Sequence, residues 1–284
     1  MNSDIFACEV CPRLCRIAEG GTGFCGARGV LINPDTGEKS VVSINYGKLT
    51  SIALDPVEKK PLRHFHPGKM ILSVGSFGCN LICPWCQNHS ISRAKENDVE
   101  IQELKPDELA VLAERYAAAG NIGVAFTYNE PLVGYEYAKD TSKILKERGL
   151  MSVLVTNGYM NTQLFSEILP FIDAMNIDLK SVREDFYKKI GGRLDVVEKN
   201  IKSAAARCHV EITCLLIGGE NDSEEEMEEM TDFIASLSSE IPFHISRFFP
   251  RYKMTEHEET KKETMEQFKR IAMSKLKYVY LGNI

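Results

Sequence analysis

The stretch that decides the fold is Gly-Cys-Asn-Leu-Ile-Cys-Pro-Trp-Cys, which spans residues 78–86. It follows an apolar run at residues 70–74 and places Cys79, Cys83 and Cys86 in a C-x3-C-x2-C pattern. Three thiolates on one short loop can hold three corners of a four-iron cluster, whereas such clusters normally take four cysteines. One iron then lacks a protein ligand, and an open coordination position is typical of metal sites that carry out chemistry. The pattern predicts a catalytic [4Fe-4S] centre on this loop.

Two other interpretations of the same three cysteines stay open. With His89 as a fourth ligand, the set matches a zinc site. Alternatively, the cysteines are buried structural residues, because a free cysteine packs as a small apolar side chain. The zinc interpretation leaves the rest of the chain unexplained, and three core cysteines within eight residues beside Gly and Pro are unusual.

The composition limits the class of protein. The chain has 284 residues, enough for one large domain with an appendage. Its net charge of −6, with both signs interspersed, disfavours nucleic-acid binding. No run of about 18 apolar residues predicts a membrane span, and residues 1–4 lack the features of a secretory leader. A cytoplasmic protein is therefore expected, in which nine cysteines indicate metal or redox chemistry more than disulfides.

Beyond residue 69, apolar runs of β-type alternate with helical segments. Near-continuous apolar runs are typical of parallel strands that are covered on both faces. Strands are predicted at residues 70–74, 122–127, 151–156, 174–179, 210–217 and 243–248, with a seventh at 278–281. Helices are predicted at residues 104–119, 132–148 and 224–237, the last with a capping box that begins at Ser223. We expect an α/β fold, a partial (β/α)6 TIM-type barrel over residues 69–284, and a small cysteine-rich head with a connecting segment over residues 1–68.

Polar side chains follow the predicted strands at the point where each strand ends. Active sites of parallel barrels lie at this edge of the sheet. The segments are Thr-Tyr-Asn-Glu-Pro at 127–131, Thr-Asn-Gly at 156–158, Asn-Ile-Asp-Leu-Lys at 176–180, Gly-Gly-Glu-Asn-Asp at 218–222 and His-Ile-Ser-Arg at 244–247. Any one of them is an ordinary turn signal, but their repetition indicates a functional site.

The cysteine motif, with an aromatic residue before its last cysteine, resembles that of the radical S-adenosylmethionine (SAM) enzymes. The resemblance implies that the open iron binds the amino and carboxylate groups of SAM. One-electron reduction then releases a 5′-deoxyadenosyl radical, which abstracts hydrogen from a substrate. The electron comes from a low-potential donor such as a ferredoxin or a flavodoxin. The resemblance places Trp85 beside the SAM adenine, and a core position for this ring is an equal alternative.

Within this superfamily, the strand-end segments are most similar to those of glycyl-radical-enzyme activases such as pyruvate formate-lyase activating enzyme. Glu130 matches the glutamate of their Gly-Gly-Glu-Pro segment, which contacts the SAM amino group, while Tyr128 and Asn129 replace the two glycines. A carboxylate facing an ammonium group makes a strong charge-assisted hydrogen bond. The alternative is that Glu130 only caps the helix that follows Pro131.

Further activase segments are matched after the next strands. Thr156 and Asn157 match their Asp-Thr-Asn-Gly segment, in which Val155 replaces the aspartate. Asp178 and Lys180 match Asp-Leu-Lys, whose lysine reaches the SAM carboxylate and whose aspartate lies near a monovalent cation. The alternative for this pair is a buried ion pair.

The last two strand-end segments carry weaker signals. Residues 218–222 resemble the glycine-containing turn that supports the adenine, although a plain turn is equally compatible. His244 and Arg247 form a basic pair that suits the SAM ribose or an acidic substrate group. A core histidine with satisfied hydrogen bonds is the alternative for His244.

Four more cysteines near the N-terminus form a second set, Cys8, Cys11, Cys15 and Cys25. Four thiolates complete a metal site that is closed to substrate, which is either a second iron–sulfur cluster or structural zinc. A small head of loops with little core would need a metal to fold, and four free thiols are the remaining alternative. Cys208 and Cys214 belong to neither set and are expected in the core.

The head segments narrow the resemblance. Cys-Pro-Arg-Leu-Cys at 11–15, Gly-Phe-Cys-Gly-Ala-Arg at 23–28, Leu-Asp-Pro-Val-Glu-Lys-Lys-Pro-Leu at 54–62 and Cys-Pro-Trp-Cys-Gln-Asn-His at 83–89 are similar to the AmmeMemoRadiSam-system radical SAM enzymes, which are activase-like. This resemblance does not supply the substrate. The matches to the activase Asp-Leu-Lys and Thr-Asn-Gly segments predict an activase that forms a glycyl radical on a protein partner. Two alternatives are a radical SAM enzyme that modifies a small molecule or peptide, and a non-enzymatic zinc-binding interaction module.

Overall fold

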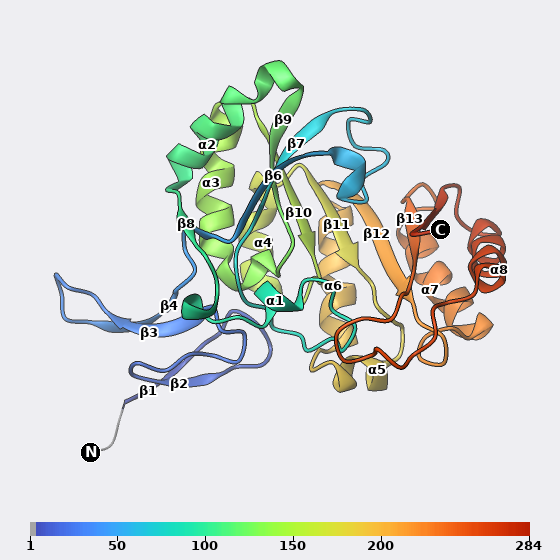
Figure 1. The fold of residues 1–284 in the computed structure, drawn as a ribbon, viewed down its shortest axis with the longest axis horizontal. Coiled ribbons are helices and arrows are strands. Elements are labelled where there is room, and N and C mark those ends of the chain that lie inside the picture. The colour runs from blue at the N-terminus through green and yellow to red at the C-terminus, as the bar shows by residue number, and fades with distance from the viewer. Residues whose placement is uncertain (1–3) are drawn as a thin grey trace.

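An eight-stranded sheet forms the centre of the computed structural model, which describes residues 4–284 (Figure 1). The sheet order follows the chain order from β6 to β14, and β6 alone runs antiparallel to its neighbour. Its strands are β6 (Ser51–Pro56), β7 (Met70–Gly75), β9 (Asn121–Phe126), β10 (Met151–Thr156), β11 (Ala174–Asp178), β12 (His209–Leu216), β13 (Phe243–Arg247) and β14 (Val279–Gly282). This curved parallel sheet confirms the expected α/β partial barrel. The leader prediction rested partly on residues 1–3, which lie outside the described residues.

Helices cover the outer face of the sheet, as Figure 1 shows for α2, α3 and α6–α8. The helices are α1 (His89–Ser92), α2 (Pro106–Arg115), α3 (Tyr135–Glu147), α4 (Thr162–Ile168), α5 (Glu184–Lys189), α6 (Leu194–Ala205), α7 (Glu224–Leu237) and α8 (Lys262–Met273). Short 3-10 turns are η1 (Val57–Lys59), η2 (Glu96–Asp98), η3 (Ala117–Ala119), η4 (Pro131–Gly134) and η5 (Leu169–Phe171). Consecutive strand residues are fully buried, as Val153 and Leu154 of β10 and Ala174 and Met175 of β11 show, because both faces of each strand are covered.

The helix predicted at residues 132–148 is divided in two. The turn η4 comes first, and α3 begins only at Tyr135. Gly134 ends η4 with a non-helical backbone (φ −119°, ψ 41°), and a Cβ at this position would lie 2.4 Å from Oδ1 of Asn45. The Asn45 amide in turn donates to the carbonyl of Phe77, just before the first motif cysteine. This close approach anchors the cysteine loop to the start of α3.

The capping box predicted at Ser223 is only half formed. The Ser223 side chain accepts a hydrogen bond from N of Glu226, as expected at a helix start. The Glu226 carboxylate does not return to Ser223, but accepts hydrogen bonds from Oγ of Ser181 and N of Val182. It therefore fixes the loop that follows β11 and is buried, although it stands in a run of glutamates.

The N-terminal segment forms small hairpins beside the main sheet. β1 (Ile5–Ala7) pairs with β2 (Arg16–Ala18), β3 (Arg28–Ile32) pairs with β4 (Lys39–Ser43), and β5 (Lys48–Leu49) pairs with β8 (Gln102–Glu103). Figure 1 places the β1–β2 and β3–β4 hairpins at the same end of the sheet as α1, whereas the β5–β8 pair joins segments that are far apart in the chain. The strand β6 lies within the segment we ascribed to the head and its connection, but it belongs to the main sheet. Across residues 4–284, no helix is long and apolar enough to cross a membrane.

Candidate functional site

A cavity of about 300 Å³ opens at the carboxyl ends of the parallel strands. This volume is at the lower end of the range of small-ligand sites in proteins. Its walls come from the cysteine loop, from the ends of β9, β10 and β11, and from the segment that follows β13. The predicted site residues that line it are Cys79, Cys83, Trp85, Cys86, Glu130, Thr156, Asn157, Asp178 and Lys180.

The backbone of the cysteine loop is held by specific contacts on both sides. Asn129 donates from Nδ2 to the carbonyls of Phe77 and Gly78, at 3.1 Å each. On the other side, N of Cys79 donates to the carbonyl of Cys25 at 3.2 Å. Gly78 has a φ of +95°, a conformation that favours glycine. The loop that presents the three cysteines is therefore fixed by the strand β9 segment and by the head.

Tyr128 stands where the activases have the first glycine of Gly-Gly-Glu-Pro. Its φ is +71°, which is unusual for a residue with a side chain. Two contacts hold it there: its hydroxyl donates to Oδ2 of Asp55 at 2.8 Å, and its carbonyl accepts from Nδ2 of Asn88 at 2.7 Å. A strained residue that lines a ligand-sized cavity is typical of functional sites.

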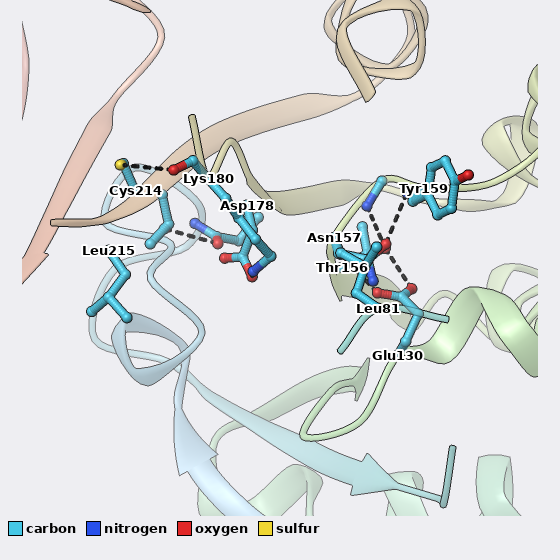
Figure 2. A network of polar contacts seen from close by, with 12 residues as sticks. Leu81, Glu130, Thr156, Asn157, Tyr159, Asp178, Lys180, Cys214 and Leu215 are labelled. Atoms are coloured by element: carbon cyan, nitrogen blue, oxygen red, sulfur yellow. Dashed lines mark hydrogen bonds and ion pairs between the residues drawn. The ribbon is translucent and has the colours of Figure 1, made fainter. Parts of the chain in front are cut away.

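The Glu130 carboxylate joins the ends of β9 and β10 (Figure 2). It accepts hydrogen bonds from Oγ1 of Thr156 at 2.6 Å and from N of Asn157 at 2.7 Å. It also caps η4, because N of Leu132 donates to it at 3.0 Å. Burial raises the pKa of Glu130 to about 7, although these hydrogen bonds act in the opposite direction. A carboxylate has about four acceptor positions, so one is left for a ligand in the cavity.

Asn157 connects the end of β10 with the cysteine loop. Its Nδ2 donates to Oδ1 of Asn80 at 3.0 Å and lies 3.8 Å from Sγ of Cys79. Its Oδ1 accepts from N of Tyr159, which fixes the orientation of the amide. Donors directed at cysteine sulfur are one means by which proteins adjust the potential of iron–sulfur clusters.

Asp178 and Lys180 form an ion pair at the end of β11 (Figure 2). Nζ of Lys180 lies 2.6 Å from Oδ2 of Asp178, and both side chains line the cavity. Burial by itself lowers the pKa of Lys180, but the neighbouring Asp178 carboxylate outweighs this and the net shift is upward. The ammonium group therefore stays charged and is paired with a carboxylate on the same cavity wall.

Trp85 and His244 differ in their positions. Trp85 lines the cavity and also packs on Phe186, with ring centroids 5.5 Å apart. His244 is not among the cavity residues: its Nε2 lies 2.6 Å from Oε2 of Glu211, and its ring stacks on Tyr280. These contacts match the alternative interpretation, in which His244 is a core histidine with satisfied hydrogen bonds.

The three motif cysteines fit an iron–sulfur cluster. All three line the cavity. Burial raises the pKa of Cys79 well above its usual value and that of Cys83 to about 11. Buried thiols of this kind become thiolates when they bind a metal, and thiolates are the ligands of such clusters. His89, the fourth ligand of the zinc alternative, is not among the cavity residues and stacks on Tyr252.

The six remaining cysteines lie outside the cavity of the three motif cysteines. Cys8, Cys11, Cys15 and Cys25 line one small second cavity in the head. Cys214 is fully buried and Cys208 packs against the core, as expected for the two remaining cysteines. None of the nine cysteines forms a disulfide, and within residues 4–284 no three Cys, His, Asp or Glu side chains are arranged to enclose a single metal ion.

Several cavity residues were not assigned to the site from the sequence. They are Gln87, Asn88, Ser92, Phe248, Phe249, Arg251 and Asn283. Asn88 and its neighbours directly follow the last motif cysteine, a position that could have indicated them. Asn283 is far from the cysteine motif in the sequence, and its Nδ2 donates to the carbonyl of Arg247. No local pattern links such distant residues.

Three comparisons place the chain among known proteins. It is 39% identical over 281 residues to an uncharacterized protein of Methanocaldococcus jannaschii, covering 98% of this chain and 81% of that protein. It is 22% identical over 217 residues to the pyruvate formate-lyase 1-activating enzyme of Escherichia coli K12, covering 68% of this chain and 85% of that enzyme. A radical SAM methyltransferase structure from Sphaerobacter thermophilus shares the fold, with a TM-score of 0.58, 16% identity, and coverage of 90% of this chain and 76% of the other.

The family model of the radical SAM superfamily matches residues 73–234. This range contains the three motif cysteines and the ends of β9, β10 and β11 that surround the cavity. The chain therefore belongs to the radical SAM superfamily.

Proposed function

We propose that this protein is a radical SAM enzyme that cleaves SAM in the cavity at the carboxyl ends of the strands. The observation that carries the proposal is that Cys79, Cys83 and Cys86 share this cavity with Glu130 and Lys180. A [4Fe-4S] cluster held by the three cysteines supplies the electron and the open iron position, and the 5′-deoxyadenosyl radical that results abstracts hydrogen from a substrate. The electron donor we propose is a ferredoxin or a flavodoxin.

The protein's own residues orient SAM in this proposal. The free acceptor position of Glu130 receives the SAM ammonium group in a charge-assisted hydrogen bond, and the ammonium charge stabilises the carboxylate that burial disfavours. The Lys180 ammonium faces the SAM carboxylate, and its pairing with Asp178 holds it in place. The Trp85 ring gives an apolar wall for the adenine. Together these groups position the sulfonium for cleavage and exclude water from a reactive radical.

The test is SAM cleavage by the anaerobically reconstituted protein with dithionite as reductant. We expect 5′-deoxyadenosine from the native protein and none from Cys83→Ser, because the cluster loses one of three protein ligands. Cys208→Ser is the matched control, since Cys208 packs against the core outside both cavities, and it should cleave SAM normally. The proposal is wrong if SAM leaves the spectrum of the reduced protein unchanged, or if Cys83→Ser cleaves SAM as fast as the native protein.

For the substrate, we propose activation of a protein partner by glycyl-radical formation. The support is the match of Glu130, Asp178 and Lys180 to activase segments and the similarity to pyruvate formate-lyase activating enzymes. Incubation with a candidate partner and SAM should give the doublet of a glycyl radical in electron paramagnetic resonance. The second candidate is a small molecule or peptide. Transfer of deuterium from a labelled metabolite or peptide into 5′-deoxyadenosine, without any glycyl doublet, would favour it.

A further inference from the structure

The four head cysteines surround one cavity together with two arginines. Besides Cys8, Cys11, Cys15 and Cys25, the walls include Arg13, Arg28 and Asn80. The backbone brings two of them side by side, because N of Cys8 donates to the carbonyl of Cys15 at 2.8 Å. Cysteines that are spread over eighteen residues of sequence thus line one cavity.

The two arginines have buried donors without acceptors. Nε of Arg13 and Nε of Arg28 are buried and lack any hydrogen-bond partner. Arg28 is only 5% exposed, and its other arm is engaged, since NH1 bonds both oxygens of Glu136 at 2.7 Å. A buried donor that lacks an acceptor destabilises the fold. Both arginines line the cysteine cavity, so an anionic group inside it would supply the missing acceptors.

This cavity adjoins the catalytic loop. The Cys25 carbonyl accepts from N of Cys79, so a cysteine of one set is hydrogen-bonded to a cysteine of the other. A Cβ on Gly78 would lie 2.6 Å from the same carbonyl, which shows how closely the two segments pack. Asn80 lines the head cavity, while its Oδ1 accepts from Asn157 in the catalytic cavity.

We propose that the head binds a second iron–sulfur cluster on Cys8, Cys11, Cys15 and Cys25, with Arg13 and Arg28 compensating its negative charge and donating to its sulfur. Four thiolates complete the ligand set, so this centre has no open position for SAM. Throughout residues 4–284, neither cysteine set is arranged around the single point that zinc requires. The catalytic cysteines are likewise not grouped around one point. An iron–sulfur cluster accommodates such spacing because each cysteine sulfur binds a different iron. This proposal rests on the proposed function, because it treats the loop at residues 78–86 as catalytic.

The first experiment counts metals in the full-length protein after anaerobic reconstitution. We expect about eight irons in the native protein and about four in either Cys15→Ser or Cys83→Ser, since each variant loses one of two four-iron clusters. SAM should change the spectrum of reduced Cys15→Ser, which keeps the catalytic cluster, and should leave that of Cys83→Ser unchanged. Cys208→Ser is the control and should keep the native count. Zinc in the head, or about four irons in the native protein together with none in Cys83→Ser, would overturn the proposal.

The second experiment leaves all four head cysteines in place. Arg28→Lys keeps the positive charge but removes the Nε donor, so the reduced cluster loses a stabilising hydrogen bond. Measured in a Cys83→Ser background, the head cluster should titrate at a lower reduction potential than with Arg28 present. Arg193→Lys is the control, because Arg193 is exposed and paired with Asp195. An unchanged potential in Arg28→Lys would contradict the role of this arginine.

The outcomes separate this proposal from the proposed function. Two clusters without SAM cleavage would refute the proposed function and leave the head cluster in place. SAM cleavage by a protein with zinc in its head would refute only the head cluster.

Discussion

A single carboxylate, Glu130, occupies the point where the ends of β9 and β10 meet the cavity. Three protein hydrogen bonds already fix its orientation, so it is preorganised to accept a fourth from a ligand. Replacing it with glutamine keeps the shape but removes the charge and puts an NH2 group opposite a protein donor. A hydrogen bond to a charged group contributes about 1.5–3 kcal/mol.

We therefore predict that Glu130→Gln weakens SAM binding by about ten-fold or more, as this free energy implies. Equilibrium dialysis of the reconstituted protein against a series of SAM concentrations measures the affinity. Glu167→Gln is the matched control, because Glu167 forms an exposed ion pair with Lys139 away from the cavity. Unchanged affinity together with lower stability would mean that Glu130 acts only as a cap for η4.

Gly78 provides a second prediction at the residue scale. Alanine here suffers from the positive φ, which costs about 1 kcal/mol, and also from contact with the Cys25 carbonyl at 2.6 Å. Gly68 has a similar φ of +78° but open space around its Cβ position, so Gly68→Ala isolates the cost of the backbone. We expect Gly78→Ala to lose clearly more stability in urea unfolding and to retain less iron. Equal losses in the two variants would show that the packing of head against loop is unimportant.

At the scale of elements, Glu211 ties the segment before β7 to β12 and β13. Its buried carboxylate accepts from N of Arg63 at 2.9 Å, from N of His64 at 2.7 Å, and lies 2.6 Å from Nε2 of His244. Burial alone would raise the pKa of Glu211, but hydrogen bonds from the histidines and the two amides lower it to about 2. The Glu211 carboxylate therefore has a structural role, because it connects residues 63–64 with β12 and β13.

The lowered pKa of Glu211 predicts how stability depends on pH. The stabilisation is fully present above the ordinary pKa of about 4.5 and is lost as the pH falls toward 2, where the folded carboxylate binds a proton. A shift of this size corresponds to about 3 kcal/mol. The difference in unfolding free energy between the native protein and Glu211→Gln should be largest above pH 5 and should shrink at pH 3. A difference that does not change with pH would contradict this role.

The sequence predicts elements well where the signal is local. The runs at 151–156 and 224–237 coincide with β10 and α7, because continuous apolar and amphipathic periodicity directly reflects burial. Glu226 and Glu211 were not predicted as buried residues, since nothing near them in the chain identifies Ser181 or His64 as their partners. His244 shows the same limit: its position at a strand end suggested the cavity, whereas its partner on β12 holds it elsewhere.

At the scale of the whole molecule, the cavity joins segments from most of the chain. The sequence predicted the walls that carry motifs, at residues 79–86, 130, 156–157 and 178–180. It did not assign the segment around Phe248 to Arg251 or Asn283 to the cavity, because their approach depends on closing the curved sheet as far as β14. Closure of this kind is a property of the complete sheet and is not encoded in any one strand.

This convergence predicts a pattern of amide hydrogen exchange on SAM binding. In the reconstituted protein, SAM should slow exchange in peptides that cover residues 127–130, 156–158 and 247–251, because a ligand in the cavity contacts segments that are distant in sequence. Peptides from α2 serve as the internal control, since α2 packs on the outer face against β9 and α3. Mass spectrometry with and without SAM measures the effect, and Cys83→Ser should abolish it. Protection confined to the head hairpins, with none at the strand ends, would place SAM outside the cavity and contradict the assignment of this site.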